Sequence, residues 1–158
     1  MSEHIGQTTF APIDFSSVSG WNWTPTRVPI VPVAPIRSPL QQRLDEQASH
    51  VAVLDGFGNL LWVNRAWRQF AENSGLVDPT AGVGMNYLLV CDRAQGTGAY
   101  EAKIVASGIR DVIAGTYSSV YFRYGFDCPV QRNLFSVRVT RVSDEEVLRV
   151  IVAHERIL

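Results

Sequence analysis

The chain has 158 residues, of which 46% are apolar and 18% are charged, so it can bury the core of one domain. Its 14 Lys and Arg against 15 Asp and Glu give a net charge of −1, which excludes nucleic-acid binding by a generally basic surface. No apolar run is long enough to span a bilayer and the first residues lack an export signal, so we expect a cytoplasmic protein without a membrane span.

Residues 1–38 are predicted to form an extended arm. Six of the eight prolines lie in the first 39 residues, and proline disfavours both long helices and interior strands. The arm has few charges and several large apolar side chains, which are a solubility liability unless they dock on a surface. We expect it to wrap its own domain or to lie along a partner protein, and a floppy leader is the alternative. The partner-binding candidates are Phe10, Phe15, Trp21, Trp23, Val31 and Val33.

A short amphipathic helix is predicted over residues 39–48. Ser38 is a suitable N-cap, and Pro39 after it fits the first helical position. Leu40 and Leu44 lie four residues apart, on one face of such a helix. We therefore treat these two leucines as candidates for homodimerisation.

A β-hairpin and a second helix follow. Apolar residues flank a turn that contains Gly56 and Gly58, which predicts strands near 50–55 and 60–64. Asn64 stands where a helix should begin, and Gly75 stands where it should end.

The rest of the chain is predicted to hold helices and then strands. Residues 76–99 are irregular apart from a helical turn near 86–93, and apolar residues at helical spacing predict a helix over 99–114. Alternating apolar residues predict three strands, near 117–125, 132–142 and 146–155. The fold class is therefore α+β: a five-stranded antiparallel sheet with helices on one face, in one domain over 49–158.

Several short motifs occur in a fixed order along this domain. They are Leu54-Asp55-Gly56-Phe57-Gly58-Asn59, Trp62-Val63-Asn64-Arg65-Ala66-Trp67, Gly84-Met85-Asn86-Tyr87-Leu88, Val112-Ile113-Ala114-Gly115, Phe135-Ser136-Val137-Arg138-Val139-Thr140 and Val152-Ala153-His154. Together they resemble a PAS domain of the bacterial sensory type over residues 47–157. The resemblance implies a PAS-like sheet and a role in signal transduction or protein–protein interaction.

Two stretches depart from that family. PAS domains that drive an output module often end in an Asp-Ile-Thr signature, where this sequence has Arg156-Ile157-Leu158. We therefore expect no covalently attached output domain. The loop that often reads Pro-Cys-His-Ser in the family is Gly125-Phe126-Asp127-Cys128 here, which puts any chemical role of that loop in doubt.

The resemblance raises the question of a haem or a flavin, and neither is expected. A haem ligand would come from the long helix or its flanking loop, but the histidines are His4, His50 and His154. For His154 we favour a residue at the end of a strand, satisfied by backbone groups. A flavin photosensor needs a cysteine in a specific motif that surrounds neither Cys91 nor Cys128.

The cysteines and the other polar residues predict no chemistry. Cys91 is interpreted as a small buried apolar residue, and Asp127 beside Cys128 would raise the pKa of that thiol. Two cysteines are too few for a disulfide scaffold or an all-cysteine zinc site. No nucleophile–histidine arrangement or phosphate loop is present, so we expect neither an enzyme nor a metal site.

A cavity between sheet and helices is the remaining place for a ligand. Its candidate lining residues are Trp62, Phe70, Tyr87, Ile109, Phe122 and Phe135, and the alternative is that they fill the core. Two functions stay open. The first is a non-catalytic interaction module that docks on a partner protein through its sheet face and its arm, with homodimerisation as a companion. The second is a sensor that binds a small apolar ligand and signals to a separate kinase or regulator.

Overall fold

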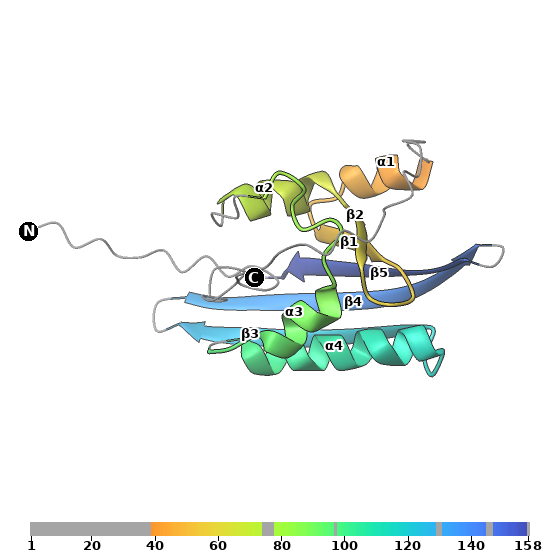
Figure 1. Cartoon of the computed structure of the whole chain (residues 1–158). Helices are drawn as coiled ribbons and strands as arrows, with labels where there is room; N and C mark the ends of the chain where they lie inside the picture. Colours follow the sequence, from red (N-terminus) through yellow and green to blue (C-terminus); the bar gives the residue numbers. More distant parts are fainter. Residues whose placement is uncertain (1–38, 74–77, 97, 129–130, 145–146, 158) are drawn as a thin grey trace, which may run out of the picture.

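The computed structural model describes residues 39–73, 78–96, 98–128, 131–144 and 147–157. The predicted order of elements is confirmed, although the first helix is shorter than expected and the late strands are slightly shifted (Figure 1). The elements are α1 (Pro39–Asp45), β1 (His50–Leu54), β2 (Leu60–Val63), α2 (Arg65–Asn73), α3 (Tyr87–Arg93), α4 (Ala99–Ala114), β3 (Ser119–Cys128), β4 (Gln131–Asp144) and β5 (Val147–Arg156).

The strands form one antiparallel sheet in the order β2-β1-β5-β4-β3. The first strand pairs with the last, with Ala52 opposite Val152 and Val53 opposite Ile151. The early hairpin and the three late strands therefore belong to the same sheet. This confirms the predicted α+β class with a five-stranded antiparallel sheet.

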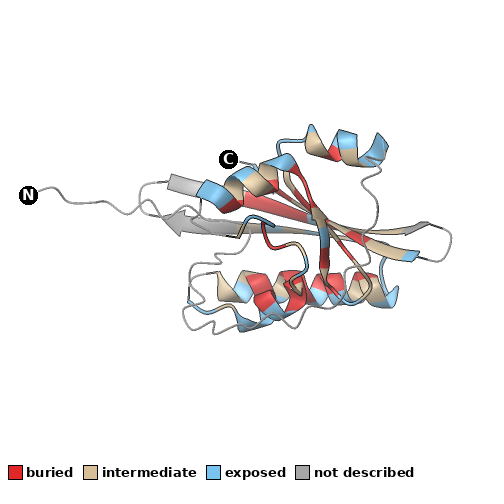
Figure 2. Ribbon diagram, turned by 45° about the horizontal axis from the view of Figure 1, so that its top comes forward, coloured by how far each residue is buried: buried red, intermediate tan, exposed pale blue. Residues whose placement is uncertain are grey.

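Alternation along the strands gives the sheet an inner face and an outer face. On the inner face Ala52, Val139 and Val152 are fully buried. Helix α4 packs on this face against β3, β4 and β5 (Figure 1), and Figure 2 shows buried residues where the helix meets the sheet. The packing is close, because a Cβ added to Gly108 of α4 would lie 2.5 Å from Cζ of Phe122.

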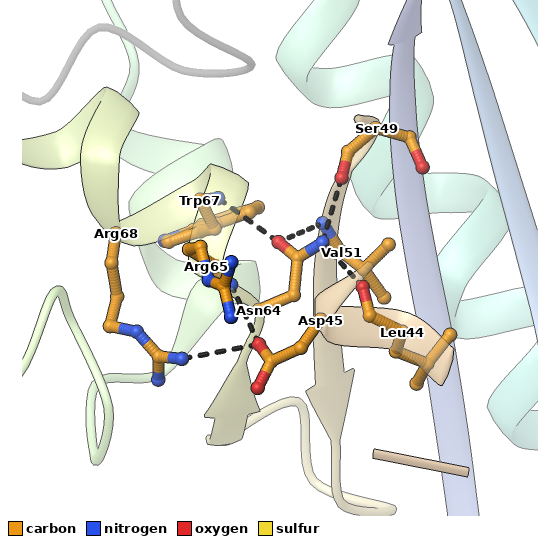
Figure 3. A network of polar contacts seen from close by, with 8 residues as sticks. All are labelled: Leu44, Asp45, Ser49, Val51, Asn64, Arg65, Trp67 and Arg68. Carbon is orange, nitrogen blue, oxygen red and sulfur yellow. Dashed lines mark hydrogen bonds and ion pairs between the residues drawn. The ribbon is translucent and has the colours of Figure 1, made fainter. Parts of the chain in front are cut away.

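Asn64 joins α1, β1 and α2 at one end of the sheet (Figure 3). Its Oδ1 accepts hydrogen bonds from the backbone N–H groups of Val51 and Trp67, both at 3.0 Å. Its Nδ2 donates to the carbonyl oxygens of Leu44 at 2.9 Å and Ser49 at 2.8 Å. The residue is fully buried, so these bonds replace water for all four backbone groups. The predicted helix start at Asn64 is confirmed.

Candidate functional site

A buried polar cluster lies in the core between the sheet and the helices. His154 of β5 is fully buried, with its Nε2 3.0 Å from the Tyr87 hydroxyl and its Nδ1 3.5 Å from the Tyr124 hydroxyl. The indole ring of Trp67 packs beside it, with ring centroids 5.9 Å from Tyr87 and 6.2 Å from His154. The expectation that backbone groups satisfy His154 is thus corrected, because its ring points into the core towards two tyrosines.

Burial keeps this cluster uncharged at neutral pH. Burial, and secondarily the neighbouring His50, lowers the pKa of His154 to about 3. Burial raises the pKa of Tyr87 well above its usual range, so both partners are neutral. A neutral imidazole has one N–H donor and one acceptor nitrogen, so one tyrosine receives a hydrogen bond and the other donates one. The cluster can hydrogen-bond a polar group in an otherwise apolar core.

The six predicted pocket residues do not gather in one place. Tyr87 and Ile109 are fully buried in the main core, and Phe122 packs against that core. Phe135 is 7% exposed and stacks on Tyr124, with centroids 5.6 Å apart.

Two of the six lie away from the core, which corrects the prediction for them. Trp62 pairs with Val53, so strand alternation puts it on the outer face of the sheet. Phe70 of α2 packs edge-on against the His50 ring, with centroids 5.0 Å apart. Spacing along the chain could not distinguish these positions from core positions.

Phe70 and His50 instead line a surface cleft of about 630 Å³ between α2 and the segment that joins α1 to β1. Asp45, Arg65 and Gln69 are among the other lining residues, so charged and polar groups share the cleft with apolar ones. The Nδ1 atom of His50 is buried and has no hydrogen-bond partner among the described residues. Burial also lowers the pKa of His50.

The cysteine predictions have different outcomes. Cys91 is a free, fully buried thiol, and burial raises its pKa, so it is confirmed as a small core residue. The side chain of Cys128 lies outside what the structure describes. The described part of the chain holds no group of three His, Cys, Asp or Glu that could bind a metal ion.

The dimerisation candidates are separated by burial. Leu40 is 49% exposed, whereas Leu44 is 7% exposed within a single chain. The structure therefore corrects the dimerisation prediction for Leu44, because a side chain already buried in its own domain cannot pack against a second copy. Figure 2 shows α1 as largely exposed around one buried band. The six arm candidates, Phe10, Phe15, Trp21, Trp23, Val31 and Val33, lie outside the described residues.

The outer face of the sheet is the second candidate site. Val53, Trp62, Ile151 and Ala153 have outward register on β1, β2 and β5, and all four are only partly buried. Tyr121, at the other end of the face, is 46% exposed. This face therefore combines partly exposed apolar and aromatic side chains, which are typical of a docking surface.

Comparison with known structures identifies the fold. The PAS domain of BvgS from Bordetella pertussis matches with a TM-score of 0.54 and 15% identity, over 75% of this chain and 84% of that one. The described domain has the PAS fold. The VqmA dimer from Vibrio cholerae matches with a TM-score of 0.52 and 16% identity, over 75% of this chain and 51% of VqmA. VqmA bound to DPO matches with the same TM-score and 15% identity, over 75% of this chain and 57% of that one.

By sequence, this PAS-fold chain matches a short part of a much larger protein. An uncharacterized 104.1 kDa protein of Rhodobacter capsulatus, in the hypE 3' region, is 41% identical over 100 residues. The match covers 61% of this chain and 10% of that protein, so the chain spans about a tenth of its length. No family model matches the sequence. Within the described residues, no helix combines the length and apolar character needed to cross a membrane.

Two members of the core cluster, Tyr124 and Trp67, are absent from the predicted pocket. Tyr124 alternates with Val120 and Phe122 on the inner face of β3, which was a usable signal. Trp67 is 3% exposed on α2, and its Nε1 donates to the carbonyl oxygen of Ala81 at 3.1 Å. No local pattern indicates that contact, since it joins α2 to an irregular segment.

Proposed function

We propose that this PAS domain is a non-catalytic signalling module that docks on a protein partner through the outer face of its sheet and its N-terminal arm. The observation that carries the proposal is the set of partly exposed apolar side chains Val53, Trp62 and Ile151 on that face. Apolar side chains on adjacent strands gain free energy when a partner excludes water from them. The fold itself, which it shares with the PAS domain of BvgS, supports a signalling role.

The docking proposal is tested by capture of partners from a native lysate with the tagged full chain. Ile151→Glu places a charge on the outer face, and Lys103→Glu changes an exposed residue of α4 as the matched control. We expect wild type and Lys103→Glu to retain a stoichiometric protein partner that Ile151→Glu loses, at equal melting temperatures. Retention of the same partner by all three proteins would refute docking through this face.

Small-molecule sensing is a second candidate, and the buried cluster of Tyr87, Tyr124 and His154 favours it. Hydrogen-bonding groups in an apolar core are the usual means of orienting a small ligand. VqmA, which shares the fold, has been solved bound to DPO. A bound ligand would signal by favouring one conformation of the domain over another.

The sensing candidate is tested by mass spectrometry of small molecules released when the purified full chain is denatured. We expect a stoichiometric molecule from wild type and a reduced amount from Tyr87→Phe, because the hydroxyl that contacts His154 is removed. Equal release by the two proteins, or no release by either, contradicts recognition by this cluster.

A further inference from the structure

The outer face of the sheet has a cationic end on β3 and β4. The Cζ atoms of Arg123 and Arg138 lie 5.7 Å and 5.5 Å from the centre of the Tyr121 ring, and Arg123 Nε donates to the Tyr121 hydroxyl at 3.0 Å. Neither arginine forms an ion pair with a carboxylate of the described residues, including Glu155 opposite Ser136. Two guanidinium groups held by one aromatic ring are suited to a carboxylate next to an apolar group.

The other end of the same face is apolar. Val53, Trp62 and Ile151 lie on β1, β2 and β5, and all three are partly buried. This end adjoins α1, because Asn64, directly after β2, holds the backbone of Leu44 (Figure 3). The face therefore runs from an apolar end near the C-terminal end of α1, at Leu44, to a cationic end on β3 and β4.

One segment of the N-terminal arm has charged and aromatic residues in the order that matches the two ends of this face. It is residues 13–24, Ile-Asp-Phe-Ser-Ser-Val-Ser-Gly-Trp-Asn-Trp-Thr. The segment has one charge, Asp14, and no proline, and Trp21 and Trp23 come later and closer to α1. In extended form the seven residue-to-residue steps from Asp14 to Trp21 span about 23 Å, and the four strand spacings from β3 to β2 span about 19 Å. The 15 residues between Trp23 and Pro39 reach up to about 45 Å, enough to return to α1.

We propose that residues 13–24 of the same chain lie across the outer face, with Asp14 at Arg123 and Arg138 and the two tryptophans on the apolar end. Covalent attachment gives the segment an effective concentration in the millimolar range, so weak contacts suffice. A second copy of the face is a poorer occupant, because a two-fold contact at the cationic end would bring arginine pairs together. The inference rests on the proposed function, in which a partner uses this face and must displace the segment.

Fluorine NMR of the full chain, labelled with 5-fluorotryptophan, tests this contact. Trp21→Phe and Trp23→Phe assign the two arm signals, and a peptide of residues 1–38 supplies their free positions. We expect Arg123→Glu with Arg138→Glu to move both signals at least halfway to the free positions, with the Trp67 core signal unchanged. Adding Asp14→Arg should restore at least half of that shift, and Lys103→Glu alone should move neither signal.

The proposal is overturned if the arm signals of the wild type lie at the free positions. It is also overturned if the double arginine variant leaves the signals unchanged, or if adding Asp14→Arg does not restore them. Wild-type signals that move to the free positions on dilution also overturn it, because they indicate contact between copies. The lysate capture with Ile151→Glu is scored separately. If the arm signals lie at the free positions and Ile151→Glu loses the partner, only this inference is wrong. If the arm is bound and Ile151→Glu keeps the partner, only the proposed docking function is wrong.

Discussion

At the scale of single residues, His154 determines how the core responds to pH. Its imidazole is fully buried beside Tyr87 and Tyr124, and a charge there would lose its hydration. Its pKa is lowered to about 3 in the folded protein, against 6.5 in the unfolded chain. Between these values the unfolded state binds more protons, so the free energy of unfolding falls as the pH falls. Above about pH 7.5 the residue is neutral in both states and adds almost no pH dependence.

We therefore expect a loss on the order of 2 kcal/mol in the free energy of unfolding between pH 6.5 and about pH 5 from His154. Urea unfolding of the full chain at several pH values measures it. His154→Phe should lose most of this slope, whereas His50→Gln should keep most of it, since His50 is less buried. An unchanged slope in His154→Phe would show that other groups carry the pH dependence.

The two tyrosine hydroxyls should differ in their effect on stability. Tyr87→Phe leaves the fully buried His154 Nε2 without its partner at 3.0 Å, so we expect a loss of about 1–3 kcal/mol in the free energy of unfolding at pH 7. Tyr124→Phe removes a contact of 3.5 Å that is only partly buried, so its loss should stay below about 1 kcal/mol. Urea denaturation measures both, and equal losses would contradict the assignment.

At the scale of elements, one side chain connects three of them. Asn64 caps α2 through the N–H of Trp67 and holds the backbone of α1 and β1 through Leu44 and Val51. Asn86 has the same capping role in α3, where its Oδ1 accepts from the N–H of Leu89 at 3.0 Å, but its contacts are more exposed. The two asparagines therefore form a matched pair that differs mainly in burial.

We expect Asn64→Ala to lower the free energy of unfolding by at least about 3 kcal/mol, because it removes a helix cap and leaves buried backbone groups without hydrogen-bond partners. Asn86→Ala should cost about 1 kcal/mol, the usual effect of an exposed cap. Chemical denaturation measures the difference. Similar losses for the two variants would mean that burial of the Asn64 network contributes little.

At the scale of the whole molecule, the sheet separates two candidate roles. Its inner face holds the cluster around His154, and its outer face holds the apolar and cationic ends described above. The protein-docking proposal concerns the outer face, and the sensing candidate concerns the core. Helix α1 lies at the edge of this division, with Leu44 buried and Leu40 exposed.

Because Leu40 is exposed and Leu44 is buried, we expect different outcomes when each is replaced by a charged residue. Leu40→Glu should change the free energy of unfolding by less than about 0.5 kcal/mol and convert any dimer formed through α1 to a monomer. Leu44→Glu should cost more than about 3 kcal/mol, because it buries a charge within one chain. Light scattering after gel filtration, together with thermal melting, measures both. A Leu40→Glu protein that remains dimeric would exclude α1 as the dimer contact.

The sequence alone was sufficient for features that depend on neighbours in the chain. The spacing of apolar residues predicted α4 over 99–114, and Asn64 was recognised as a helix start, since periodicity and capping involve residues a few positions apart. The five-stranded sheet also followed from local patterns. The motif order was enough to indicate a PAS domain, although each motif by itself is short.

Only the tertiary structure decided which side chains meet. Strand register places Trp62 opposite Val53 and so on the outer face. The packing of α3 brings Tyr87 to His154, 67 positions away in the chain. Residues that far apart interact only after the sheet has paired and the helices have packed, and a one-residue change in register would exchange the two faces. For the same reason, the four-residue spacing of the two leucines in α1 could not show that Leu44 is buried and Leu40 exposed.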